Sequence, residues 1–155
     1  MARWRWKLRR LAGLDSARRV LLIEAAALLL LARLALLLLP FPWLARRLGT
    51  FVPPTDSRVA LGGSESAQEH RLLAHEVGWA VTRAARHVPF TAVCLPQAMA
   101  AQFMLRRRHV ATVMHFGVAK GIATPLSAHA WLYAAGVEVT GFPVAEGFTK
   151  IGCFV

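Results

Sequence analysis

The hydrophobic period of the chain changes near His109, and this change limits the folds that the chain can adopt. Before it, apolar side chains recur at helical spacing in two segments, 67–88 and about 95–108. After it, "VATVMHFGVA" and "AHAWLYA" are β-rich or alternating, which is typical of strands. A turn at Gly136 indicates a hairpin, and "FTKIGCFV" indicates a closing strand. Helices followed by about four strands predict an α+β fold with an antiparallel sheet.

The first 50 residues form a basic and leucine-rich segment. They hold ten Arg or Lys and two acids, a net charge of +8 out of +11 for the whole chain. Within them, 20–39 is apolar nearly all round, and we expect a helix that begins near Asp15 or Ser16 and stops before Pro40. Such a helix either packs on protein or lies against a membrane, and the basic charge favours an acidic partner or an anionic membrane face.

Whether this helix spans a bilayer is left open by its sequence. Residues 20–39 are long enough to cross a hydrocarbon core of about 30 Å. However, Glu24 and Arg33 lie inside the run, and each buried charge costs about 2.5–3.5 kcal/mol on insertion scales. A signal peptide is disfavoured, because this run is longer than the usual apolar region of a signal peptide and contains charges. It is also not followed by a small-residue cleavage site. A cytoplasmic protein, with membrane association as an alternative, is the expectation.

Composition excludes several other classes of protein. The two cysteines form no disulfide framework, which favours a reducing cytosol. The basic charge comes with no recognised nucleic-acid motif, so we expect no nucleic-acid partner. The Pro, Gly and Ser residues of 51–65 predict a linker between the helical segment 1–50 and a domain at 66–155. Ser66 and Glu69 fit a capping box at the start of that domain.

Cys94 stands at the start of the second expected helix of this domain. Unpaired backbone N–H groups and the positive end of the helix dipole converge there, so a thiolate is stabilised. The same N–H groups can hold a developing oxyanion, which suits a nucleophile for acyl transfer. The alternative is a buried structural cysteine, which is the commoner role of a lone thiol.

His129 lies in the alternating run, with Trp131 and Tyr133 on the same face of the expected strand. It could serve as a base if a helix packed on the sheet brings the Cys94 thiol within hydrogen-bond distance. A half-buried histidine with no chemical role is the alternative. Other candidates are His70, His75, His87, His109 and His115. No Cys/His spacing fits a zinc site, and we expect neither a metal nor a cofactor.

Two motifs together resemble a known family. "CLPQAMAAQFMLRRRHVATVMHFGVAKG" followed by "AHAWLYAAGVEVTG" is similar to the transglutaminase-like leader peptidase of lasso-peptide biosynthesis, the stand-alone processing protein found where the maturation B protein is split. The resemblance covers about residues 75–155, and the leucine-rich segment also looks like the family's N-terminus. It implies a transglutaminase- or papain-like core with a helix-borne Cys94 as nucleophile and a strand-borne His129 as base.

The same resemblance implies a substrate and partners. Such enzymes cut the leader from a ribosomally made precursor that a small leader-binding protein delivers. An ATP-dependent, asparagine-synthetase-like cyclase then closes the macrolactam ring. The chain would therefore act as a cysteine peptidase in peptide maturation. A non-catalytic, membrane-associated scaffold or adaptor in such a complex is the alternative, and a thiol redox protein is disfavoured because no C-x-x-C is present.

One departure from the family concerns its Cys-His-Asp triad, because no aspartate follows Asp56. If Ala135 and Gly136 form a two-residue turn, then Tyr133 faces Glu138, Trp131 faces Thr140, and His129 faces Phe142. Glu138 would then lie about 13 Å along the strand from His129, at roughly 3.3 Å per residue. The orienting role is left to Thr140, to a backbone carbonyl, or to no third group.

Overall fold

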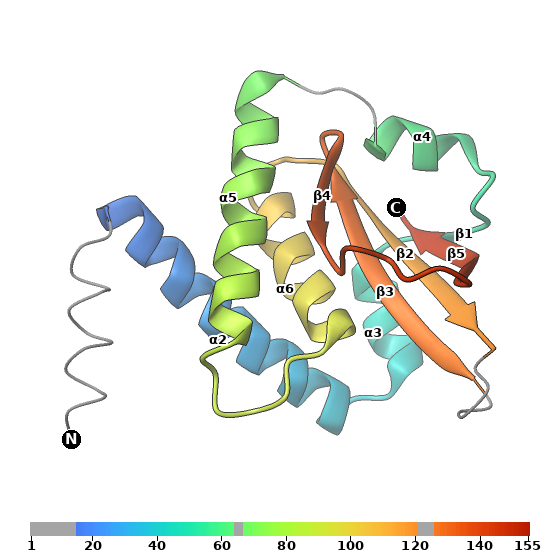
Figure 1. Ribbon diagram of the computed structural model, residues 1–155, viewed down its shortest axis with the longest axis horizontal. Coiled ribbons are helices and arrows are strands. Elements are labelled where there is room, and N and C mark those ends of the chain that lie inside the picture. The colour runs from blue at the N-terminus through green and yellow to red at the C-terminus, as the bar shows by residue number, and fades with distance from the viewer. Residues whose placement is uncertain (1–14, 64–66, 121–125) are drawn as a thin grey trace.

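The fold was determined as a computed structural model that describes residues 15–63, 67–120 and 126–155 (Figure 1). Helices occupy the N-terminal part and strands the C-terminal part, as the change of hydrophobic period predicts. The elements are α2 (Ser16–Leu38), α3 (Phe41–Leu48), β1 (Phe51–Val52), α4 (Ser57–Gly63), α5 (Gln68–Ala85), α6 (Cys94–Arg106), β2 (Thr112–Ala119), β3 (Ser127–Ala134), β4 (Val137–Thr140) and β5 (Thr149–Phe154).

The strands form one antiparallel sheet in the order β1-β5-β2-β3-β4. Helices α2, α5 and α6 share a core with one face of this sheet. The other face, with Val113 and Cys153, carries a smaller cluster that includes Val59 of α4. The two sides are visible in Figure 1, where α5 and α6 lie to the left of β4 and β3 and α4 lies to the upper right. The expected α+β fold is confirmed.

Helix α6 is the centre of the helix-side core. Its residues from Ala98 to Gln102 are buried in succession, because α2, α5 and the sheet surround it. Burial on all sides explains why its apolar residues form no narrow stripe. Close packing also depends on Gly78 of α5, where a Cβ would lie 2.6 Å from the carbonyl oxygen of Val139 on β4.

The β3–β4 hairpin is confirmed, with one change in register. Ala135 and Gly136 form the two-residue turn with φ of 51° and 74°, and Tyr133 pairs with Glu138 as expected. Beyond that pair a β-bulge shifts the register, so Thr140 pairs with Leu132. The expected pairing of Trp131 with Thr140 is therefore wrong, because an extra residue in one strand changes every partner that follows.

The N-terminal helix has the expected bounds, with Asp15 as N-cap and an end before Pro40. One side of it packs on α5 and α6. Glu24, whose side chain is 14% exposed, forms ion pairs with Arg107 at 3.2 Å and with Arg108 at 2.7 Å. Part of the three-arginine run at the end of α6 therefore anchors α2, and the acid inside the apolar run is paired.

The segment that was expected to be a linker contains regular secondary structure. Residues 51–65 include β1, which pairs with β5, and the helix α4. Helix α5 begins at Gln68 after Ala67 and ends at Ala85, whereas a helix to residue 88 was expected. Ser66, the expected cap, lies outside the described residues. The division of the chain into 1–50, 51–65 and 66–155 stays a prediction.

Candidate active site

Cys94 is the first residue of α6, as its place in the sequence predicts. Val93 precedes it in an extended conformation, and no side chain caps the helix. Gln97 closes the first turn, with its N–H bonded to the Val93 carbonyl at 3.3 Å. Its side-chain amide also donates to the carbonyl of Ala92 at 2.7 Å and so ties the approach to the helix. The thiol is half-buried and unpaired.

The helix start leaves donors free for a ligand. Pro96 has no N–H, so it contributes none. In the described part of the chain, the amides of Cys94 and Leu95 donate no backbone hydrogen bond outside the regular elements. Two N–H groups beside a thiol at the positive end of a helix dipole are suited to holding an oxyanion.

His129 lies near the start of β3 and is held by the chain that follows β4. Its Nε2 lies 2.7 Å from the carbonyl oxygen of Gly141. A carbonyl can only accept, so the proton is on Nε2, and Nδ1 of the neutral ring is left with a lone pair. This is the tautomer that a base needs if it is to take the thiol proton through Nδ1.

Aromatic side chains fix the plane of this imidazole. Trp131 stacks on it with a centroid separation of 5.8 Å and an interplanar angle of 22°. Phe148, just before β5, lies 5.5 Å away at 49°. The ring of His129 is therefore positioned by one hydrogen bond and two ring contacts from three segments of the chain.

The missing aspartate leaves open which group orients His129, and in the structure the backbone carbonyl of Gly141 bonds to its ring. Of the alternatives considered, the hydroxyl of Thr140 is buried without a hydrogen-bond partner among the described residues. The bulge beside Leu132 lets a backbone carbonyl reach His129 instead. Gly141 has φ of +85°, and a Cβ there would lie 2.6 Å from the Ala130 oxygen and 2.8 Å from the Trp131 Cβ. Only glycine fits this position without displacement.

The thiol and the imidazole lie on elements that begin at the same end of the molecule (Figure 1). Because side chains alternate along β3, Ala130 and Leu132 enter the helix-side core and His129 faces the other way. Strand β4 ends at Thr140, so β3 forms the edge of the sheet beside His129. No hydrogen bond joins Cys94 Sγ and His129 among those of the described residues. Cys94 packs against the helix-side core, so in this structure the two side chains lie on opposite faces of the sheet and are not brought together.

A second Cys–His pair was missed by the sequence reasoning. Cys153 Sγ lies 3.1 Å from His115 Nδ1, because β2 and β5 place these residues opposite one another. Burial, with a smaller effect of Lys150, lowers the pKa of His115 to about 4, and burial raises the pKa of Cys153. Both groups are held neutral, so this buried pair is not suited to nucleophilic attack.

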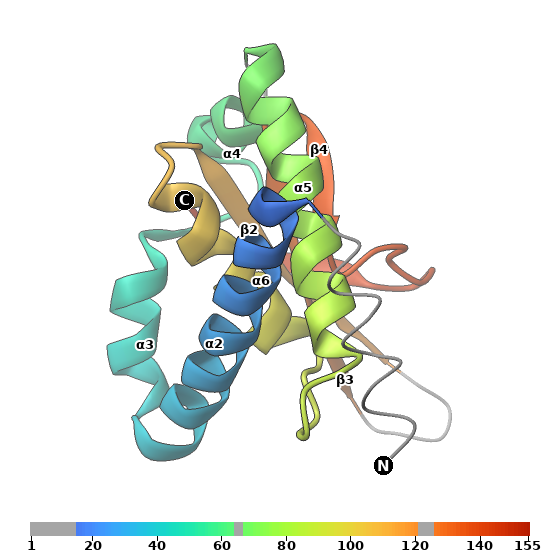
Figure 2. The same cartoon turned by 90° about the vertical axis from the view of Figure 1, so that its left-hand side faces the viewer.

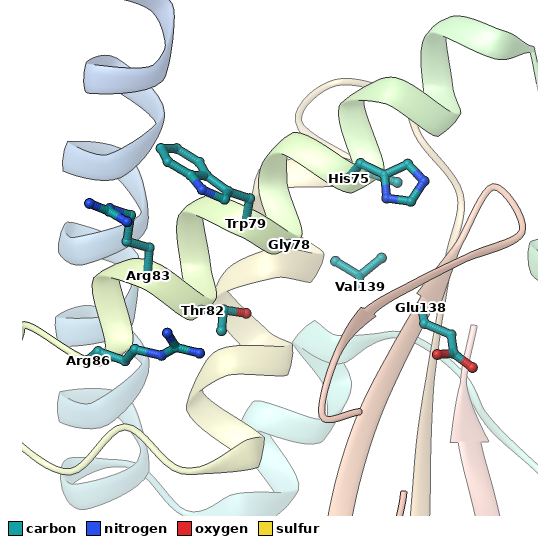
Figure 3. Close-up of a pocket in the computed structure, with 9 residues that line it drawn as sticks. His75, Gly78, Trp79, Thr82, Arg83, Arg86, Glu138 and Val139 are labelled. Atoms are coloured by element: carbon teal, nitrogen blue, oxygen red, sulfur yellow. The ribbon is translucent and has the colours of Figure 1, made fainter. Parts of the chain in front are cut away.

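The other histidines do not join the candidate site. The Nδ1 atom of His87 lies 2.8 Å from the carbonyl oxygen of Arg83, so this ring contacts the end of α5. His75 lines a hollow of about 330 Å³ between α5 and β4, together with Trp79, Arg83 and Glu138 (Figure 3). Within residues 15–63, 67–120 and 126–155, no three His, Cys, Asp or Glu side chains gather as a metal site.

The comparison with known families identifies the superfamily of the chain. The model of the transglutaminase-like superfamily matches residues 35–153, which include both Cys94 and His129. None of the curated proteins and none of the solved structures matches the chain.

Proposed function

The chain belongs to the transglutaminase-like superfamily, and on this premise we propose that it is a cysteine peptidase with Cys94 as nucleophile and His129 as base. The single observation that carries the proposal is the position of Cys94 at an uncapped helix start. The imidazole of His129 is held by the Gly141 carbonyl beside the open edge of β3, but it faces away from α6, so the proposed reaction requires the ring or the edge of the sheet to turn toward the thiol. The proposed substrate is the leader of a lasso-peptide precursor.

Each group has a defined role in the first half of the reaction. His129 Nδ1 takes the thiol proton, and Cys94 Sγ attacks the carbonyl carbon of the last leader residue. The amides of Cys94 and Leu95 stabilise the oxyanion. When the intermediate collapses, the C–N bond breaks and the imidazolium gives its proton to the leaving amine. The core peptide leaves with a free α-amine, and the leader remains as a thioester on Cys94.

Water completes the cycle. His129 takes a proton from the water, the hydroxide attacks the thioester carbonyl, and the C–S bond breaks. The leader leaves with a carboxyl group, and Cys94 recovers its proton. The free amine of the core peptide is the group that an ATP-dependent macrolactam cyclase would use, so cyclisation would follow this step.

The substrate assignment rests on sequence motifs. The Cys-Leu-Pro start, the three arginines and the Ala-His-Ala-Trp strand resemble the lasso leader peptidases. In that setting a small leader-binding protein presents the precursor to the enzyme in the cytoplasm. The peptidase chemistry and the identity of the peptide are separable, so the experiment has to address both.

Cleavage of the precursor tests both. Purified enzyme, precursor and delivery protein are mixed, and the products are weighed by mass spectrometry. We expect separate leader and core masses with the wild type, none with Cys94→Ala, and wild-type rates with the matched control Cys153→Ala. His129→Ala should match Cys94→Ala, and the double variant should add little, because residues that act as a unit are not additive. Cleavage by Cys94→Ala would contradict the nucleophile; cleavage of unrelated peptides only would contradict the substrate.

A second candidate function is a non-catalytic scaffold or adaptor in a peptide-maturation complex. It is favoured by helix α2, which is long and apolar enough to cross a membrane; only 22% of its most apolar 18-residue stretch is buried in the protein. The two functions differ in their chemistry. A peptidase forms an acyl-thioester on Cys94 that can be trapped by acid quenching of the reaction. If the protein is a scaffold, the Cys94→Ala variant supports maturation as well as the wild type does.

A further inference from the structure

The outer face of α2 carries a continuous apolar stripe. Buried residues line the inner face, which packs on α5 and α6. The outer side chains recur every three or four residues along the helix, which spans about 34 Å at 1.5 Å per residue. Ile23 is 71% exposed and Leu37 is 64% exposed, so the stripe is open at both ends. Its large members are Val20, Ile23, Leu30, Leu31, Leu34, Leu37 and Leu38.

Charges occur around this stripe and not within it. Arg19 lies at its N-terminal end, and Glu24 and Arg33, the charged residues of the apolar run 20–39, lie toward its margins, with Glu24 paired to α6. Beyond the C-terminal end, α3 exposes Trp43 next to Arg46 and Arg47, with the Arg47 guanidinium 4.8 Å from the Trp43 ring. An aliphatic surface bounded by arginine and tryptophan is typical of helices at a membrane interface.

We propose that α2 and α3 hold the protein on an anionic membrane, with α2 lying in the plane of the interface. The stripe is aliphatic and offers no hydrogen-bonding side chain, whereas protein interfaces carry about one hydrogen bond per 100–200 Å². Lipid acyl chains require none. The basic residues at both ends, within a segment of net charge +8, complement anionic headgroups. This inference does not depend on the peptidase function.

Contacts with the domain oppose a spanning orientation. The N-terminal half of the helix is held by the Glu24–Arg108 ion pair and by Arg18, whose guanidinium bonds Glu76 of α5 at 2.8 Å. Figure 2 shows α2 at the front of the molecule, in front of α5 and α6 and beside α3. To cross a bilayer, α2 would have to break these pairs and expose its inner face, which includes Leu22, Ala25 and Leu29.

Vesicle binding by the full-length protein tests the proposal. Sedimentation is measured with vesicles of phosphatidylcholine alone and with one quarter phosphatidylglycerol. We expect at least threefold stronger partition to the anionic vesicles. The double variant Ile23→Glu/Leu34→Glu should lower it at least tenfold. The matched control Ile151→Glu, at a site on β5 that is 52% exposed, should stay within twofold of the wild type. Cys94→Ala should bind as the wild type does.

Further measurements separate the other occupants of the stripe. An alkaline carbonate wash should release the protein, and retention that only detergent reverses would overturn the in-plane orientation. Equal partition of the double variant and the wild type, or no binding to either vesicle, would overturn lipid as the partner. The stripe would instead be a protein interface if the protein does not bind vesicles and forms a dimer in light scattering, or a complex with the delivery protein. The same substitutions should then abolish that dimer or complex. Circular dichroism checks folding, and Leu37→Glu near the helix end replaces the double variant if that variant unfolds.

Discussion

The imidazole of His129 donates through Nε2 to the backbone carbonyl of Gly141, at 2.7 Å. A carbonyl can orient a histidine and select its tautomer, but it carries no charge to stabilise the imidazolium that forms during catalysis. The family's aspartate would supply both effects. Gly141 therefore accounts for how a chain without that aspartate can still hold the imidazole of His129 in a fixed orientation.

The first prediction concerns this contact, and its spectroscopic part requires no substrate. In spectra of the ¹⁵N-labelled protein above neutral pH, the His129 ring should be in the Nε2–H tautomer, because the carbonyl accepts from that atom. Gly141→Ala should lose this signature and lower kcat/KM by about 10- to 100-fold, since a base that is not held loses orientation. Gly147→Ala is the matched control. Gly147 also has positive φ, at +94°, but no atom lies within 4 Å of its added Cβ. A ring in the Nδ1–H tautomer would contradict the assignment.

Secondary structure and the hairpin could be predicted from the sequence because they depend on local patterns. Helix α2 begins at Ser16, just after the N-cap residue Asp15, and ends at Leu38, shortly before Pro40. The turn at Ala135 and Gly136 follows from residue type and alternation. The order of strands was not predicted, because β5 pairs with both β1 and β2 over long separations. Nothing local in the sequence indicates such pairings.

The sequence indicated candidate residues for the site, which stay a prediction, but it did not indicate their geometry. Cys94 was placed at a helix start because the apolar period resumes just after it. The partner of His129 depended on a β-bulge, and a bulge leaves no mark in residue type here. The pairing of Cys153 with His115 depended on the register between β2 and β5. Knowledge of that register would have revealed it, because both residues then face the same side.

The second prediction concerns the buried His115. Its pKa is lowered to about 4, from an ordinary value of 6.5, mainly by burial. Between these values the unfolded chain binds a proton that the folded chain does not, so stability falls as pH falls from about 6.5 to 4. At about 1.4 kcal/mol per pKa unit the loss is about 3 kcal/mol. Urea unfolding across this range should be less pH-dependent in His115→Gln. An equal slope in the two proteins would contradict the buried neutral ring.

The third prediction is that Cys153 is dispensable for peptidase activity. The thiol is fully buried, and burial raises its pKa, so it is a poor nucleophile despite its contact with His115. Cys153→Ser should keep most activity in the cleavage assay, with a stability loss of about 1 kcal/mol from the polar change. Loss of activity with unchanged melting would indicate a mechanism that uses both thiols.

The fourth prediction separates two neighbouring arginines that bond the same carboxylate. Arg108 lies 2.7 Å from Glu24 with a side chain 27% exposed, and it also donates to the Met104 carbonyl at 2.8 Å. Arg107 lies 3.2 Å from Glu24 and is 68% exposed. Solvent screens the exposed pair, so Arg107→Ala should cost less than about 0.5 kcal/mol.

Removing Arg108 leaves the half-buried Glu24 without its closer partner, so Arg108→Ala should cost about 1–2 kcal/mol. The free energy of unfolding in urea measures both variants. Because Glu24 joins α2 to the end of α6, hydrogen exchange of α2 amides should also rise in Arg108→Ala and stay near wild type in Arg107→Ala. Equal effects of the two substitutions would mean that packing of the inner face of α2, and not this ion pair, holds the helix on the domain.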